Sequence, residues 1–375
     1  MGCNFCSTSA MFGGKGKSIN FYETGDELFA VMCRLEEKLD VQSFFAMDEN
    51  FLLYRKRALR LLELMQEHDK AWSIYTFSSA RTLRSYTMEQ LVGLGLSWLW
   101  LGLEGEKSQY NKLNGVDTHE LVREFQSHGI RVLGSTIVGL ETHTPENIQA
   151  AIDFGVSHGT DFHQFMLYTP IPGTPLWEEH KADGSLLDES ELGFADIHGQ
   201  YKFNYRHPHI RDGQESELLI GAFDHDFNVN GPSLLRMVRN TLSGWKRYRD
   251  HQDQRIRRRW LREAKELRTT YAGAVWAMAH LPTAKPVWRA EAQRLLGDLY
   301  TEMGWRTRLV APVIGRGLRV TIAREERRLA AGWTYEPPTI CEKNAAAKAL
   351  EDEARQPLFG SEIGWVTCQP QVVGS

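Results

Sequence analysis

Arg131-Val-Leu-Gly-Ser-Thr-Ile-Val138 is a short apolar run between two stretches of helical period, and this alternation recurs along the first half of the chain. Similar strand-like runs lie at 42–47, 72–77, 97–103 and 161–168. The helical stretches lie at 24–39, 53–68, 87–94, 118–128 and 144–158. The first of them opens with Thr24 and Glu27 at capping-box spacing. Strands that alternate with helices predict a mainly parallel sheet, because a helical crossover is the usual connection between parallel neighbours.

The composition is that of a folded protein. The chain has 375 residues, of which 42 % are hydrophobic and 25 % are charged. This length predicts one large domain and a smaller one. The formal net charge of -4 excludes a globally basic nucleic-acid binder and leaves a local basic patch open.

Cysteine usage and hydropathy bear on the compartment. Five cysteines spread over the chain do not form the dense framework of a secreted disulfide protein. No run approaches the roughly 18 apolar residues of a membrane span, and no basic flank leads into an apolar signal core. We therefore expect a cytoplasmic localisation.

The segment Thr169-Pro-Ile-Pro-Gly-Thr-Pro175 breaks regular structure, since each proline fixes φ and removes a donor. We interpret it as the exit from the last strand of a domain that covers residues 1–180. An irregular connection is expected at 181–231, a helical, basic C-terminal region at 232–335, and a disordered tail at 336–375.

The opening Met1-Gly-Cys3-Asn-Phe5-Cys6 places two cysteines at C-x2-C spacing on a glycine-containing loop. Two thiolates at this spacing can converge on one metal. A structural zinc site would need a second pair, and the other cysteines provide none at short spacing. Two unpaired buried cysteines are the alternative interpretation.

Together with Phe12-Gly-Gly-Lys15 and the alternating strands and helices, this loop resembles the radical S-adenosylmethionine (SAM) superfamily, in particular its cobalamin-associated branch with a B12-binding domain. The resemblance covers residues 1–180. It implies an α/β fold, a partial (β/α)6 TIM-like barrel of parallel strands, followed by a mostly α-helical C-terminal region. In that family a [4Fe-4S] cluster is held by C-x3-C-x2-C and cleaves SAM to a 5'-deoxyadenosyl radical.

Cys3 and Cys6 match the second and third cysteines of that motif, and Phe5 matches the aromatic residue before the last one. The first ligand is then expected four residues upstream of Cys3, before Met1. The first barrel strand and a cobalamin-binding domain are expected there too, so we expect an N-terminally truncated chain. The implied cofactors are the [4Fe-4S] cluster, SAM and, through the missing domain, cobalamin.

The resemblance also assigns residues to the SAM pocket at the C-terminal ends of the strands. They are Phe5, Asp48 (with Glu49 and Asn50), Glu104 in Leu101-Gly-Leu-Glu-Gly, Ile137, Gly139 and Tyr168. Asp48 could instead cap the next helix. Gly139 could simply form a strand-to-loop turn, and Tyr168 could be a core tyrosine. Arg81, after the second strand, matches a polar position of the family or is a surface arginine.

Three further motifs do not support a site. Gly16-Lys17-Ser18 lacks the first glycine of a phosphate-binding loop, since Met11 stands there. Asp196-Ile-His198-Gly199 has its glycine two positions too early for a cobalamin-ligating motif. His207-Pro-His209 has no nearby residues at ligand spacing, which favours a solvated loop.

Residues 236–268 contain twelve Lys and Arg against four Asp and Glu, interleaved with Trp245, Tyr248 and Trp260. Such a stretch could bind a nucleic acid or an anionic membrane surface. The alternative is a basic helix packed on the barrel.

The leading hypothesis is a radical SAM enzyme that generates a 5'-deoxyadenosyl radical or transfers a methyl group. A small-molecule or lipid-like substrate is expected, with flavodoxin or ferredoxin as electron donor. The competing hypotheses are an RNA-modifying radical SAM enzyme and an inactive truncated fragment.

The genomic DNA immediately upstream of the Met1 codon tests the expected truncation. We predict an in-frame cysteine codon four positions before Cys3, preceded by strand-like sequence, because the cluster needs a third thiolate. A stop codon or frameshift in that interval would instead identify the chain as a disabled remnant.

Overall fold

The computed structural model describes residues 3–11, 21–48, 51–103, 115–188, 191–192, 202–211 and 213–332. Residues Met1–Leu318 form one compact unit and Arg319–Ser375 form a second. The first unit contains every strand that lies within the described residues, and it is described below.

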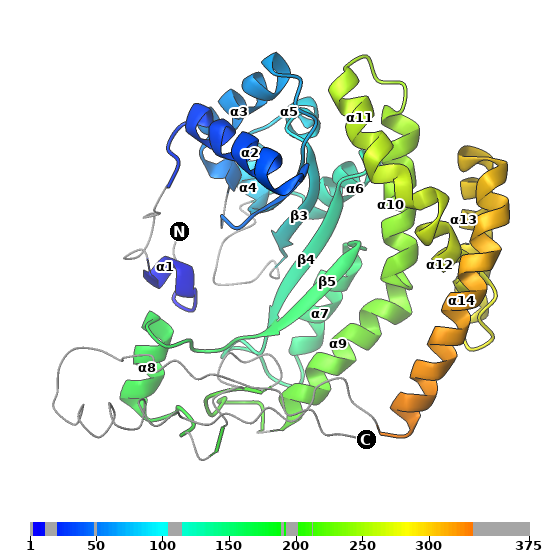
Figure 1. Cartoon of the computed structure of the whole chain (residues 1–375). Helices are drawn as coiled ribbons and strands as arrows, with labels where there is room; N and C mark the ends of the chain where they lie inside the picture. Colours follow the sequence, from blue (N-terminus) through cyan, green and yellow to red (C-terminus); the bar gives the residue numbers. More distant parts are fainter. Residues whose placement is uncertain are drawn as a thin grey trace, which may run out of the picture. The chain divides into compact units, whose positions relative to one another are not determined.

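A parallel sheet of five strands forms the centre of this unit, in the order β1-β2-β3-β4-β5 (Figure 1). The strands are β1 (Ser43–Ala46), β2 (Ser73–Ser78), β3 (Leu96–Gly102), β4 (Arg131–Val138) and β5 (Phe162–Leu167). Each of the four neighbouring pairs is parallel. All five strands lie where the hydrophobic runs predicted them. Closure of the sheet into a barrel remains a prediction.

Helices connect the strands, as the helical periods predicted. They are α2 (Gly25–Leu39), α3 (Arg55–Glu67), α4 (Ala80–Leu83), α5 (Met88–Gly93), α6 (Thr118–Ser127) and α7 (Ile148–Ser157), with the short 3-10 helix η1 (Phe51–Leu53) before α3. The capping box at the start of α2 is confirmed, since the Glu27 amide donates to the Thr24 hydroxyl and the Thr24 amide donates to the Glu27 carboxylate.

The sheet has one buried face and one half-exposed face, because successive side chains of a strand point in opposite directions. Leu99, Leu101 and Val132 belong to the buried face and pack in the main hydrophobic core with residues of α3 and α6. The alternate residues form what we call the inner face. Its members are Phe45, Tyr75, Phe77, Trp98, Trp100, Leu133, Ser135, Ile137, Phe162, Gln164 and Met166, all half-buried or exposed.

The chain after β5 is helical over most of its described length. The short α8 (Pro175–Asp183) contacts the loop that precedes the N-terminal α1 (Ser7–Met11), through Leu176 and Asn4 (Figure 1). The later helices are α9 (Gln214–Asn230), α10 (Ser233–Tyr248), α11 (Gln254–Glu263), η3 (Ala264–Arg268), α12 (Thr270–Ala279), α13 (Pro286–Met303) and α14 (Trp305–Ala330). Helix α9 corrects the expectation of an irregular connection over 181–231. Its buried positions follow helical spacing but include the acidic Glu215 and Asp226, while large apolar residues such as Phe223 are exposed, so the sequence shows no clear apolar stripe.

A buried carboxylate fixes α10 against the sheet. Asp161 accepts hydrogen bonds from the Val132 amide of β4 at 2.9 Å and from the Asn240 side chain of α10 at 3.0 Å. Burial raises the pKa of Asp161, and these donors oppose that effect by favouring the carboxylate. The same residue therefore connects the first half of the chain to the helical region.

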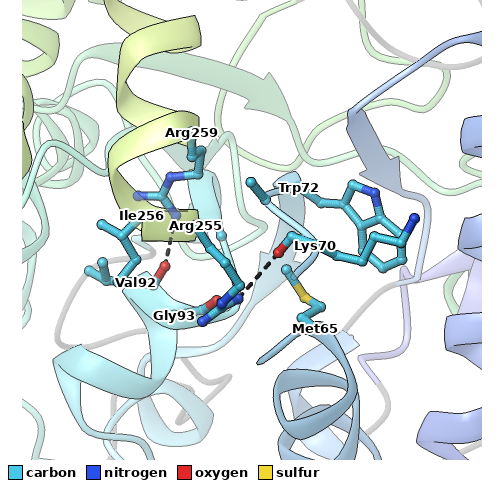
Figure 2. Close-up of a pocket in the computed structure, with 10 residues that line it drawn as sticks. Met65, Lys70, Trp72, Val92, Gly93, Arg255, Ile256 and Arg259 are labelled. Atoms are coloured by element: carbon cyan, nitrogen blue, oxygen red, sulfur yellow. Dashed lines mark hydrogen bonds between the residues drawn. The ribbon is translucent and has the colours of Figure 1, made fainter. Parts of the chain in front are cut away.

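Arginines of α11 attach this helix to the end of α5 and to the loop between α3 and β2 (Figure 2). Arg259 is buried and donates to the Val92 carbonyl at 2.8 Å, and Arg255 donates to the Lys70 carbonyl at 3.2 Å. Cations near the last carbonyls of a helix are also favoured by its dipole. Within the described ranges, none of the helices has both the length and the apolar composition that a membrane crossing requires.

We predict opposite effects of Gly→Ala at two helical positions. A Cβ at Gly244 of α10 would lie 2.0 Å from the ring of buried Trp260, so Gly244→Ala should lower the free energy of unfolding by about 1–3 kcal/mol. Gly297 of α13 has no atom within 4 Å of such a Cβ, so Gly297→Ala should raise it by about 0.4–1 kcal/mol. Urea unfolding of both variants checks the signs. Equal stability of the two variants would contradict the packing of α10 on α11.

Candidate functional site

The cysteine loop lies at the C-terminal edge of the sheet. The Cys6 amide donates to the Cys3 carbonyl at 3.1 Å, which closes a turn that brings both residues to the start of α1. The Ser9 amide is 3.5 Å from the Cys6 sulfur. Both cysteines are partly exposed.

Three contacts hold the loop against the end of β5. Tyr168, the residue after β5, donates its hydroxyl hydrogen to Asn4 Oδ1 at 3.2 Å. The rings of Phe5 and Tyr168 meet edge to face with centroids 5.5 Å apart. The Leu176 amide of α8 donates to the Asn4 carbonyl at 3.1 Å. These contacts place Tyr168 next to the loop that carries Cys3, Phe5 and Cys6.

Ile137 also belongs to this neighbourhood. It packs, with Phe5, against a small apolar cluster of Leu140, Tyr168 and Leu176. Ile137 is the penultimate residue of β4, and the Tyr168 amide bonds to the Val138 carbonyl at 2.8 Å. The ends of β4 and β5 and the cysteine loop therefore form one continuous structure.

Gly139 begins the loop after β4 with a φ of +73°. A side chain is disfavoured in this conformation, and a Cβ would also lie 2.5 Å from the Phe203 ring. The Gly139 and Leu140 amides both donate to Nδ1 of His143, at 3.1 and 3.3 Å. The expected strand-to-loop turn is present, and it directs the backbone back toward the sheet edge.

His143 is neutral in this loop. Burial, together with the nearby His207, lowers its pKa from 6.5 to about 4. Nε2 of His207 carries the hydrogen and donates it to the Leu140 carbonyl at 3.0 Å, since a carbonyl oxygen can only accept. Its Nδ1 then accepts from the His209 and Ile210 amides. His207 therefore has a structural role in place of the solvated loop expected there.

Asp48 lies two residues after β1 and pairs with Arg57 of α3 at 2.9 Å. The Arg57 side chain is 6 % exposed and that of Asp48 is 39 % exposed, so the carboxylate remains accessible. This ion pair was not among the two interpretations of Asp48, which were SAM binding and helix capping. Arg81 is exposed on α4. Glu104, Glu49 and Asn50 lie outside the described residues.

The cysteine loop supplies two thiols toward an iron-sulfur cluster. Within the part of the chain that the structure describes, no three His, Cys, Asp or Glu residues are grouped as metal ligands. The donor chemistry of Cys3 and Cys6 fits two corners of a cluster, and a third ligand would have to come from outside the described residues. Cys341 and Cys368 also lie outside them.

On the inner face, side chains form rows that run across the strands, because the register aligns equivalent residues of neighbouring strands. Ile137 pairs with Met166, and Ser135 pairs with Gly102 and Gln164. Two aromatic rows follow toward the other end of the strands. The first contains Phe77, Trp100, Leu133 and Phe162, and the second contains Phe45, Tyr75, Trp98 and Arg131. The rows were not predicted from the sequence, although aromatic residues at positions i and i+2 of β2 and of β3 are a signal for them.

The aromatic residues of the basic segment 236–268 lie in the core. Trp245, Tyr248 and Trp260 are 7 %, 6 % and 1 % exposed. Base stacking requires exposed rings, so these three do not provide a nucleic-acid surface. Several arginines of the segment also bond within the protein; Arg236, for example, pairs with Asp226 at 2.7 Å.

Sequence comparisons place the chain among proteins named as methyltransferases. No protein-family model matches it. Over 228 residues it is 27 % identical to an uncharacterized methyltransferase of Pyrococcus horikoshii, and this match covers 59 % of this chain and 48 % of that protein. Over 191 residues it is 31 % identical to the bacteriochlorophyllide d C-12(1)-methyltransferase of Chlorobaculum tepidum, and this match covers 48 % of this chain and 40 % of that protein.

A third relative is the hopanoid C-2 methylase of Rhodopseudomonas palustris, which is 25 % identical over 240 residues. That match covers 60 % of this chain and 44 % of the methylase. The chain thus spans less than half the length of each of these three relatives. Its similarity is to methyltransferases, several of which are named for the compound they methylate.

We predict that the His143 ring titrates with a midpoint at about 4. The unfolded chain binds this proton near 6.5, so the folded state loses stability as the pH falls from about 6.5 to about 4. Histidine NMR resonances followed against pH check the midpoint, with His143→Gln to assign the signal. His158 and His163 also have pKa values of about 4, so they contribute to the same loss of stability with falling pH. The resolved His143 resonance is therefore the decisive readout. A midpoint near 6.5 for His143 would contradict the bonded loop.

Proposed function

We propose that this chain is the catalytic part of a radical SAM methyltransferase, in which Cys3 and Cys6 hold a [4Fe-4S] cluster. The observation that carries this proposal is the position of the Cys3-Asn-Phe-Cys6 turn. It packs on Tyr168 and Ile137, at the C-terminal edge of β4 and β5. Binding sites of parallel α/β sheets lie at this edge. The similarity to named methyltransferases supports the type of reaction.

The cluster, when bound, supplies the electron that cleaves SAM and leaves one iron for the amino and carboxylate groups of SAM. Thiolates are the iron ligands, so Cys3 and Cys6 would bind deprotonated. Phe5 and Tyr168 fix the turn that carries them, through their ring contact and the bond to Asn4. The thiols are thereby held at the strand ends before any cofactor arrives.

The remaining assigned residues position SAM along the strand ends. Asp48 offers an accessible carboxylate to the SAM amino group, while Arg57 keeps that side chain oriented. Ile137 and Gly139 present an apolar side chain and a backbone without Cβ, which suits the flat adenine ring. Glu104 is assigned by resemblance alone. Cobalamin belongs to a separate domain in the family that the sequence resembles, and these roles are the same with or without it.

Substitution of the cysteines tests the assignment directly. Anaerobic reconstitution with iron and sulfide should give a brown protein that forms 5'-deoxyadenosine from SAM in the presence of dithionite. Cys3→Ala and Cys6→Ala should each lower bound iron and reduce product formation at least ~100-fold, because a cluster with a missing thiolate is labile. The chain is tested together with any in-frame upstream residues. Iron is measured colorimetrically and the product by mass spectrometry.

Cys33→Ala is the matched control. Cys33 lies on α2 against the main core, and burial raises the pKa of its thiol, so it is a poor metal ligand. This variant should keep the iron content and the product of the parent. A parent protein without iron and without 5'-deoxyadenosine, or equal activity of Cys6→Ala and the parent, would refute the proposed function.

A further inference from the structure

The two aromatic rows of the inner face form an unusually continuous ring surface. Phe45 and Tyr75 stack with centroids 4.2 Å apart and an interplanar angle of 10°. Phe77 and Trp100 lie 4.8 Å apart, and Trp98 and Phe162 lie 5.8 Å apart. The series crosses β1, β2, β3 and β5. It therefore extends over most of the width of the sheet.

The stacking direction determines which part of the rings faces outward. Neighbouring strands are about 4.8 Å apart, so rings that stack across strands at 4.2 Å stand upright on the sheet. Phe45 and Tyr75 therefore present their hydrogen-bearing edges to the open side, whereas the ring planes of Phe77 and Trp100 are inclined to each other by 32° and those of Trp98 and Phe162 by 40°. Aromatic edges are electropositive and prefer the face of another π-system. The surface therefore favours a flat conjugated ligand that lies across the rows, where a saturated ring system would gain dispersion contacts only.

A cavity of about 400 Å³ adjoins the second aromatic row at the N-terminal ends of the strands. Its aromatic wall is formed by Phe44, Phe45, Tyr75 and Trp98. Its polar floor contains Arg131, Glu263 and the serines 43, 73 and 97. This volume is within the usual range of small-molecule pockets, about 300–1,000 Å³. The cavity can therefore take part of a ligand and hydrogen-bond a polar substituent.

The floor is pre-organised by α11. Glu263 bonds to Arg131 at 2.5 Å and accepts from the Ser73 hydroxyl at 3.0 Å. The Arg131 guanidinium also lies 4.9 Å from the Trp98 ring centre, so it connects the floor to the aromatic wall. The helical C-terminal region thus completes a pocket that the strands alone leave open.

Along the strands, the aromatic rows are separated from the cysteine loop by enough distance for a bound SAM molecule. Ile137 contacts the loop cluster, and Leu133 belongs to the first aromatic row. At about 3.3 Å per residue, these levels are about 13 Å apart along β4. Ser135 and Gln164 occupy the level between them. This leaves room for SAM near the loop and for a second molecule on the rings.

We propose that the inner face binds the methyl acceptor, and that this acceptor is a flat, conjugated polycyclic molecule with a polar substituent. The inference rests on the proposed function, since it names the substrate class of the same site. Phe45, Tyr75, Phe77, Trp98 and Trp100 contact the ring system, and the floor around Arg131 bonds the substituent. One relative is named for bacteriochlorophyllide d, a flat conjugated tetrapyrrole, and another for hopanoids, which are saturated polycycles, so the aromatic surface and not the relatives' names carries this choice.

Binding of protoporphyrin IX to the full chain tests the proposal without cluster or SAM. The Soret band of the porphyrin should shift on saturable binding of one molecule per chain. Phe45→Ala and Trp100→Leu should each raise the Kd about fivefold or more, through loss of edge-to-face contacts. Phe45 is 45 % exposed on the edge strand, so Phe45→Ala is expected to fold. Near-UV circular dichroism verifies the fold of both variants.

Trp305→Leu and a saturated ligand are the controls. Trp305 is 66 % exposed on α14, so its removal tests for nonspecific adhesion and should leave the Kd unchanged. Lithocholate, a saturated polycyclic carboxylic acid, should compete only weakly. Non-saturable porphyrin binding, equal affinity in Phe45→Ala, Trp100→Leu and the parent, or equally strong binding of lithocholate would overturn the proposed substrate class.

The outcomes for the two proposals are separable. Porphyrin binding that depends on Phe45 and Trp100, in a chain that forms no 5'-deoxyadenosine, would support the ring-binding face and refute the radical function. Product formation from SAM without ring-dependent binding would refute the substrate class alone.

Discussion

Parallel pairing of consecutive strands is the constraint on which the rest of the structure depends. It brings the carboxyl ends of all five strands to one edge, and it directs alternate side chains to one face of the sheet. The cysteine loop docks at that edge through Tyr168 and Ile137. The same register aligns Phe45 with Tyr75 and Phe77 with Trp100 on the inner face of the sheet.

The helical C-terminal region supports this site from the opposite end of the strands. Its arginines bond to helix carbonyls and carboxylates, as Arg259 does with Val92. Buried Asp161 connects α10 to β4, and Glu263 of α11 reaches the floor of the inner face. The buried arginines of the basic segment 236–268, such as Arg236, Arg255 and Arg259, therefore attach the helices to the rest of the unit, and other basic residues of the segment, such as Arg247, are exposed. The buried arginines hydrogen-bond buried polar groups whose burial would otherwise lower the stability of the fold.

The strands and helices of the first half could be predicted from sequence, because their hydrophobic periods are clear and their caps have local signals, such as Thr24 and Glu27. The C-x2-C loop, Ile137, Gly139 and Tyr168 could also be located on the strand ends. The aromatic rows could not, since they depend on register between strands far apart in sequence. The helix over 214–230 was missed because its apolar residues form no clear stripe. The Arg57 partner of Asp48 likewise became visible only in three dimensions.

The proposed function requires that the turn of Cys3 and Cys6 hold a cluster that binds SAM at the edge of the sheet. Electron paramagnetic resonance of the anaerobically reconstituted, dithionite-reduced protein tests this requirement. We expect a [4Fe-4S] signal whose g values change when SAM is added, and no such signal in Cys6→Ala. A signal that SAM leaves unchanged, or one that persists in Cys6→Ala, would contradict it.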